Sequence, residues 1–211
     1  MATRILLADD HAVVRSGFRL LLEGSPDIEV VAEAASGEDA YREYFQCRPD
    51  IVLMDLSMPG MSGLEAMSRI LARDPGARIL ALSAHEDTAH VKRALKIGAA
   101  GYLSKRSAPD ELIEAIRQAS EGKIYIEAGI AQQLAVQQLT GAANPVEVLS
   151  NREFEVFLHL GRGKSVAETA DLLNLSPRTV GTHLYNIKQK LGASNAAEIA
   201  LAAIRAGLIE P

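Results

Sequence analysis

The chain has 211 residues, enough for one large domain or two small ones, and its 48% hydrophobic and 23% charged composition is typical of a globular protein. No apolar run approaches the roughly 20 residues that cross a bilayer, which excludes a membrane-spanning protein. Acids directly follow the first apolar run, a pattern that is not typical of a signal peptide, so we expect none and expect a cytoplasmic location. The single cysteine, Cys47, excludes an internal disulfide and fits a reducing compartment.

The net charge of −5 is unevenly distributed. Residues 1–144 carry 15 basic and 20 acidic residues, whereas residues 145–211 carry seven of each. Within the second part, residues 172–197 contain no acid and include Arg178, Lys188 and Lys190. A local basic face in an acidic protein indicates a nucleic-acid contact, although a solvated helix face would explain it equally well.

The first part of the chain alternates strand and helix patterns. Short runs rich in Ile, Val and Leu predict buried strands at 4–8, 28–32, 50–54, 78–82 and 101–103. Apolar residues at helical spacing predict helices at 12–23, 37–46, 61–72, 87–97 and 109–121. Five strand–helix units of this length predict an α/β fold, a doubly wound parallel sheet of five strands with right-handed crossovers.

Polar side chains stand at the ends of four of these strands. Asp9 and Asp10 follow the first run, Asp55 the third, Ser83 the fourth and Lys105 the last. Ligands of open α/β sheets bind beyond the carboxyl ends of the strands, so we expect these side chains to meet there. Three carboxylates, a hydroxyl and a lysine at one edge indicate phosphoryl transfer onto an aspartate.

The acids suit a magnesium ion, which prefers carboxylates, water and phosphate oxygens as ligands. Asp10 and Asp55 are the expected direct ligands, Asp9 acts through water, and the main-chain carbonyl of Ser57 completes the protein's share. Asp55 is the best nucleophile because it ends the central strand and precedes the turn SMPGMSG. Lys105 would relieve repulsion among the acids and bind the incoming phosphoryl group, to which Ser83 would donate its hydroxyl.

The segments LLADDH, DIVLMDLSMPGMSGLEA, ILALSA and GAAGYLSK resemble the receiver domain of two-component response regulators over residues 3–121. The resemblance implies that Asp55 is the phosphoacceptor, Ser83 the switch hydroxyl, Lys105 the phosphate-binding lysine and Tyr102 the aromatic switch residue, with Asp9 and Asp10 as the acidic pair. His85 and Ser57 match positions that tune phosphoryl lifetime in that family. Arg106 stands where many receivers have proline after the lysine, at a peptide bond that is often cis.

The C-terminal part is predicted to be all helical, with helices at 150–160, 165–173, 177–191 and 195–206. Ser150 and Glu153 form a capping-box pattern, and Ser176 followed by Pro177 marks the start of the third helix. The short connection at 174–176 fits a helix-turn-helix, whose second helix enters the major groove of DNA. We therefore predict three parts: a receiver domain at 1–122, a linker with a short helix near 132–139 at 123–145, and an all-α four-helix DNA-binding domain at 146–211.

Residues 146–209 resemble the LuxR-type helix-turn-helix, and with the receiver this places the whole chain near the NarL/FixJ family of response regulators. The match implies that Thr179, Gly181, Thr182 and Tyr185 face the groove. It also implies that Arg178, Asn186, Lys188 and Lys190 reach phosphates or nearby base edges. The final helix, rich in Ala, Ile and Leu, is expected either to form a dimer surface or to be buried within its own bundle.

The expected function is that of a phosphorylation-controlled transcription regulator. A sensor histidine kinase would phosphorylate Asp55, and the protein would then bind a two-fold DNA operator as a homodimer. We expect no enzymatic activity beyond its own phosphoryl transfer and slow autodephosphorylation. One alternative is an aspartate-based phosphatase, which would need a substrate lid and a general acid where this chain has Ser57. The other is a regulator that binds DNA without phosphorylation.

Overall fold

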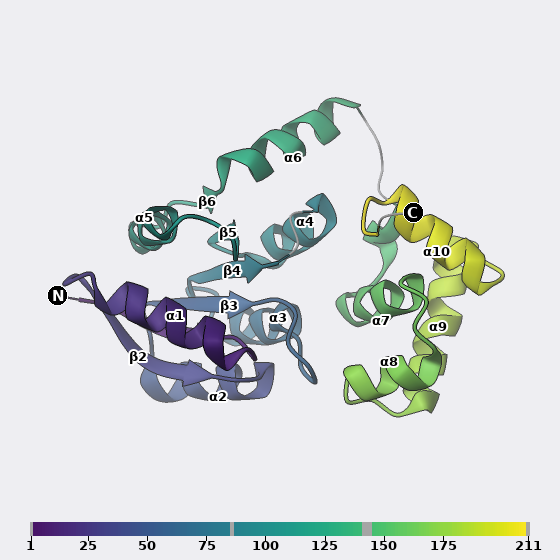
Figure 1. Cartoon of the computed structure of the whole chain (residues 1–211), viewed down its shortest axis with the longest axis horizontal. Helices are drawn as coiled ribbons and strands as arrows, with labels where there is room; N and C mark the ends of the chain where they lie inside the picture. Colours follow the sequence, from purple (N-terminus) through teal and green to yellow (C-terminus); the bar gives the residue numbers. More distant parts are fainter. Residues whose placement is uncertain (1, 85–86, 141–144, 210–211) are drawn as a thin grey trace. The chain divides into compact units, whose positions relative to one another are not determined.

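The computed structural model describes residues 2–84, 87–140 and 145–209, which form two compact units, residues 1–134 and residues 135–211 (Figure 1). His85 and residues 141–144 of the expected linker lie outside the described residues.

The first unit is built on a parallel sheet, which has six strands among the described residues. Their order across the sheet is β2-β1-β3-β4-β5-β6. The strands are β1 (Thr3–Ala8), β2 (Ile28–Ala34), β3 (Ile51–Asp55), β4 (Ile79–Ser83), β5 (Gly101–Ser104) and β6 (Tyr125–Ile126). β3 lies between β1 and β4, so the predicted central strand is confirmed.

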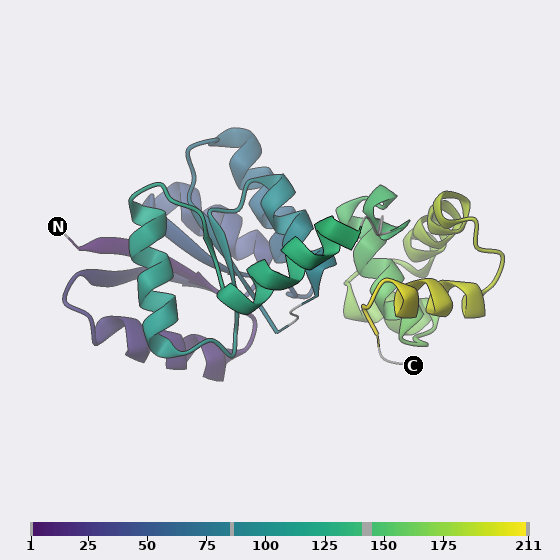
Figure 2. The ribbon, with the colours of Figure 1, turned by 90° about the horizontal axis from the view of Figure 1, so that it is seen from above.

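Helices cover both faces of this sheet (Figures 1 and 2). Alternate strand residues such as Leu53 and Leu82 pack with α1 (Ala12–Glu23) and α5 (Pro109–Ser120). The intervening residues pack on the other face with α2 (Gly37–Cys47), α3 (Gly63–Arg73) and α4 (Thr88–Ile97). The side-chain period of two in a strand explains why nearly continuous apolar runs serve two cores.

The sixth strand corrects the expectation of five. β6 pairs in parallel with β5, placing Tyr125 opposite Gly101 and Ile126 opposite Tyr102. The two strands approach so closely at Gly101 that an added Cβ would lie 2.4 Å from the main-chain oxygen of Tyr125, so only glycine fits there. A strand of two residues carries too short a pattern to be predicted from sequence.

The helix in the expected linker is longer than predicted. α6 runs over Ala128–Thr140, and its residues Ile130 and Leu134 pack against the core that α2, α3 and α4 cover. β6 and the start of α6 are therefore part of the first compact unit.

The second unit is helical, and its expected helices are confirmed. A short 3₁₀ turn, η1 (Pro145–Val148), precedes α7 (Asn151–Gly161), α8 (Val166–Leu172), α9 (Pro177–Leu191) and α10 (Ala196–Arg205). The capping box of Ser150 and Glu153 is present, and the Ser176 side chain accepts a hydrogen bond from the Thr179 N–H. A capping box that we had not predicted, Ser165 with Glu168, starts α8.

α10 packs against α7, and its residues Ile199 and Ala203 are buried. Leu201, on the outer side of the same helix, is 43% exposed. The inner face of the helix thus serves its own bundle, and a dimer role for the outer face stays a prediction. Among the described residues, no helix combines the length and apolarity needed to cross a membrane.

Candidate functional site

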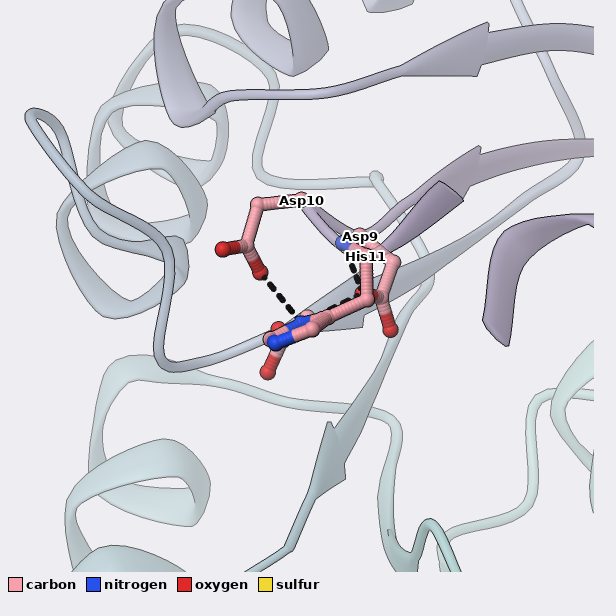
Figure 3. Close-up of side chains that lie close together, drawn as sticks. Asp9, Asp10 and His11 are labelled. Atoms are coloured by element: carbon pink, nitrogen blue, oxygen red, sulfur yellow. Dashed lines mark hydrogen bonds and ion pairs between the residues drawn. The ribbon is translucent and has the colours of Figure 1, made fainter. Parts of the chain in front are cut away.

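The sheet brings three of the predicted carboxylates together. Ala8 pairs with Met54, so Asp9 and Asp10, which follow β1, stand beside Asp55 at the end of β3. One ligand atom from each of these acids, and one from His11, lie within 4.8 Å of one another. Figure 3 shows Asp9, Asp10 and His11 converging. Asp9 and Asp55 are only 2% and 1% exposed, so their charges need a partner.

Lys105 supplies that partner from the end of β5. Its Nζ lies 2.6 Å from Asp9 Oδ2 and 2.7 Å from Asp55 Oδ2. Burial raises the pKa of Asp55, and the neighbouring Lys105 only partly opposes this. Burial alone would lower the pKa of Lys105, but the attraction of Asp55 and Asp9 outweighs it and raises that pKa. The ammonium group is therefore charged and held between two carboxylates.

The turn after β3 fixes the other oxygen of Asp55. The Ser57 N–H donates to Asp55 Oδ1 over 3.0 Å. Gly63, the first residue of α3, lies so near that an added Cβ would be 1.9 Å from the Asp55 main-chain oxygen. The carboxylate thus has one oxygen held by the backbone and one facing Lys105, while metal binding by the Ser57 carbonyl stays a prediction.

Ser83 and Tyr102 are both fully buried in strands beside this site. Ser83 ends β4, and its carbonyl accepts a hydrogen bond of 2.8 Å from the Lys105 N–H. Tyr102 pairs with Ala81 and lies within the core under α2, α3 and α4. The structure therefore places Tyr102 inward, and the switch roles of both residues stay predictions. The Lys105–Arg106 peptide bond is trans.

The donor set fits a divalent cation that prefers oxygen. The Oδ2 atoms of Asp9 and Asp55 are buried, and Lys105 is the cation that faces them. Asp10 Oδ1 is also buried, and it lies 2.9 Å from Nδ1 of His11. Clustered carboxylate oxygens match the ligands that magnesium takes in proteins.

His11 was missed by the sequence prediction. Its Nδ1 lies 2.9 Å from Asp10 and 3.4 Å from Asp9, while its side chain is 66% exposed. Its position directly after the acidic pair was the signal that could have indicated it.

The second candidate site is the outer face of α9. Arg178, Thr182 and Tyr185 recur at intervals of four and three residues and are exposed, Tyr185 by 64%. Gln189 continues the same row and is exposed, although it was not predicted. The helical spacing alone would have indicated it. An added Cβ on Gly181 would meet nothing within 4 Å, so the surface beside this row is open.

Hydrogen bonds hold the first two turns of this helix together. The Thr179 and Ser176 hydroxyls lie 2.8 Å apart, and the Thr182 hydroxyl donates to the Arg178 carbonyl. Asn186 is half-buried at the margin of the face.

Two of the lysines predicted to reach phosphates make contacts within the domain, and their contacts with DNA stay a prediction. Lys188 Nζ donates to the Ser194 carbonyl over 2.9 Å, and Lys190 Nζ donates to Glu153 Oε2 over 2.6 Å. The structure thus does not bring Lys188 and Lys190 together with the exposed row that contains Arg178.

Comparisons with known proteins find a family for each of the two parts of the chain. Residues 5–117 match the response regulator receiver domain family, and residues 147–203 match the luxR family of bacterial regulatory proteins. The chain is 41% identical over 206 residues to the response regulator UvrY of Escherichia coli K12, covering 97% of this chain and 94% of that one. It is 38% identical over 209 residues to the response regulator GacA of Pseudomonas viridiflava, covering 98% of each.

The chain is also similar to solved structures of a response regulator. RcsB from Salmonella enterica serovar Typhimurium, bound to the promoter P1flhDC with the phosphomimetic BeF₃⁻, has a TM-score of 0.70 and 25% identity, covering 96% of this chain and 98% of that one. A structure of two RcsB dimers on two parallel DNAs has a TM-score of 0.62 and 25% identity, covering 97% and 98%.

Proposed function

We propose that a phosphoryl group on Asp55 controls the binding of this protein to DNA. The premise is that the chain belongs to the NarL/FixJ family of two-component response regulators and regulates transcription through a receiver and a LuxR-type DNA-binding domain. The observation that carries the proposal is the placement of Lys105 between the buried carboxylates of Asp9 and Asp55. A buried lysine in such a position is available to bind a phosphoryl group added to the neighbouring acid.

The phosphoryl donor would be a phosphohistidine of a sensor histidine kinase. A carboxylate oxygen of Asp55 attacks phosphorus, the P–N bond breaks, and its electron pair returns to the imidazole, which then takes a proton. Asp10, Asp55 and the Ser57 carbonyl would hold magnesium directly and Asp9 through water, and the bound ion would neutralise charge on the phosphoryl oxygens. The Ser57 N–H keeps Asp55 oriented for this attack.

Charge at the site changes partners once Asp55 carries the phosphoryl group. Lys105 can no longer bind the free carboxylate of Asp55 and pairs with a phosphoryl oxygen, and the Ser83 hydroxyl donates to another. Tyr102 and the neighbouring helices respond as a two-state element whose equilibrium the new charge biases. The protein would have no other enzymatic activity than this transfer and a slow autodephosphorylation.

The phosphorylated protein would bind a two-fold operator as a homodimer in the cytoplasm, where the chromosome lies. The exposed row of α9 presents Thr182, Tyr185 and Gln189 to the groove, and Arg178 to a phosphate. One domain offers few free basic groups, so its affinity for DNA should be weak, and a second copy would supply the rest. The dimers in the similar RcsB structure on DNA support this arrangement.

Two arms of one experiment test the proposal. The first is intact-mass measurement after incubation with acetyl phosphate and magnesium, where we expect one phosphoryl adduct on the natural protein and none on Asp55→Asn. The second is DNA binding with and without beryllofluoride and magnesium, with tighter binding expected only when Asp55 is present. Equal DNA affinity in both states would favour the phosphorylation-independent regulator. Hydrolysis of small phosphate esters would favour the phosphatase.

A further inference from the structure

Glu127, the residue directly after β6, reaches across to the loop that carries Lys105. Its Oε2 accepts a hydrogen bond of 3.0 Å from the Ser104 N–H and one of 2.6 Å from the Ser107 hydroxyl. These two donors stand on either side of Lys105 in the chain. A carboxylate that accepts two bonds at once makes stronger contacts than a neutral acceptor would.

The main chain of the same residue is also fixed at both of its ends. The Glu127 N–H donates to the Tyr102 carbonyl over 3.3 Å, and the Glu127 carbonyl accepts from the Ala131 N–H over 2.9 Å, the first helical bond of α6. One residue therefore contacts β5, the loop at 104–107 and the start of the helix that leaves the receiver.

Close packing holds β6 in the position from which Glu127 reaches the loop. The Tyr125 N–H donates to the Ala100 carbonyl over 3.1 Å, and glycine at 101 permits the approach. On the far side of the loop, the Lys105 N–H donates to the Ser83 carbonyl. The backbone of Lys105 is thus held between Ser83 on β4 and Glu127 from the segment after β6.

We propose that Glu127 is a positioning residue for Lys105 and that it transmits the state of Asp55 to α6. This proposal rests on the proposed function. When Lys105 leaves the Asp9 and Asp55 carboxylates for a phosphoryl oxygen, the loop at 104–107 shifts. Because the Glu127 carboxylate is bonded to both ends of that loop, the shift reaches the first turn of α6 without passing through the hydrophobic core.

The test uses the full chain with beryllofluoride and magnesium as the phosphoryl probe. Calorimetry measures the affinity for beryllofluoride. Hydrogen exchange measures the exchange rates of the backbone amides at residues 104–107 and 125–134, with and without the probe. The variants are Glu127→Ala, Glu127→Gln, which keeps one acceptor oxygen, and Ser107→Ala. Glu121→Ala is the matched control, because Glu121 lies in the same segment but pairs only with the exposed Lys123 among the described charges.

We expect Glu127→Ala to speed exchange at 104–107 without the probe and to weaken beryllofluoride binding about tenfold, the equivalent of about 1.4 kcal/mol. At saturating probe, the exchange change at 125–134 seen in the natural protein should be lost. Glu127→Gln should restore part of both effects. Adding Ser107→Ala to Glu127→Ala should change little further, since Glu127→Ala has already removed the acceptor of the Ser107 hydroxyl.

Each contrary outcome has a distinct meaning. If Glu127→Ala leaves both the beryllofluoride affinity and the exchange change at residues 125–134 as they are in the natural protein, the proposal is overturned. The same defects in Glu121→Ala would also overturn it, because they would reflect general loosening of the segment. Failure of the natural protein itself to bind beryllofluoride would instead overturn the proposed function, and the coupling with it.

Discussion

Glu153 Oε2 lies 2.6 Å from Lys190 Nζ, and the same oxygen accepts a hydrogen bond from the Ser150 N–H. One nearly buried carboxylate therefore caps the start of α7 and holds the end of α9. Burial would raise the pKa of Glu153, but the bonds from Lys190 and Ser150 outweigh burial and lower it. Lys190 consequently has a structural partner in the absence of DNA.

Replacing Lys190 should cost stability rather than DNA affinity. Lys190→Met is expected to lower the free energy of unfolding of the C-terminal unit by about 1 kcal/mol, since the lysine is partly exposed. Urea denaturation measures this loss. Arg178→Gln is the matched control, because it should leave stability unchanged while it weakens DNA binding and lowers the salt slope by about 1. A salt slope that falls equally in Lys190→Met would show that Lys190 contacts phosphate.

Removing one acid from the pocket should stabilise the protein when no metal is present. Asp10 is close to Asp9 and Asp55 but is not paired with Lys105. Asp10→Asn should therefore relieve repulsion and raise the free energy of unfolding by about 1 kcal/mol. Magnesium at about a hundred times its Kd should stabilise the natural protein by about 2.7 kcal/mol and the variant far less.

Chemical denaturation with magnesium or with a chelator tests this expectation. Glu29→Gln, an exposed acid on β2, controls for the change in net charge. Equal stabilisation of Asp10→Asn by magnesium would remove Asp10 from the set of metal ligands.

The C-terminal unit should lose stability in mild acid because of His159. Burial lowers the pKa of His159 below its usual 6.5, and Arg162 and Lys164 lower it further. Below about pH 6.5 the unfolded chain takes up a proton at His159 that the folded chain refuses, so stability falls as the pH drops toward the folded pKa. The loss between about pH 7.5 and about pH 5.5 should be smaller in His159→Gln. An NMR titration midpoint for His159 above 6.5 would contradict the argument.

Two glycine substitutions should have opposite effects on the receiver. Gly101→Ala would push β6 away from β5 and is expected to destabilise the unit by about 1–3 kcal/mol, with faster hydrogen exchange at Tyr125 and Ile126. Gly17 lies in α1 with nothing within 4 Å of an added Cβ. Gly17→Ala should therefore stabilise the protein by about 0.5–1 kcal/mol. Unchanged exchange at β6 in Gly101→Ala would mean that the strand tolerates a wider separation.

The receiver pocket was predictable because its geometry follows from strand order. Asp9, Asp55 and Lys105 each follow a buried apolar run, and parallel strands deliver their carboxyl ends to one edge. The start of α9 was equally predictable, since Ser176 and Pro177 act locally at the helix terminus.

Two of the contacts that were missed join residues that are distant in the sequence. Lys190 meets Glu153 across 37 positions of sequence, and Glu127 meets Ser104 across 23. Helical spacing indicates which side chains share a face, but it does not indicate which ammonium group will find a carboxylate on a neighbouring helix.

The position of β6 also affects solubility. Without it, β5 would be the last strand of the sheet, and its unpaired N–H and C=O groups would be open to strands from other molecules. The segment after α5 covers that edge with only two residues, too few to offer a long template of its own. Any state in which this segment detaches therefore exposes a buried, apolar strand to self-association, so weakening its attachment should lower solubility even if the phosphoryl pocket stays intact.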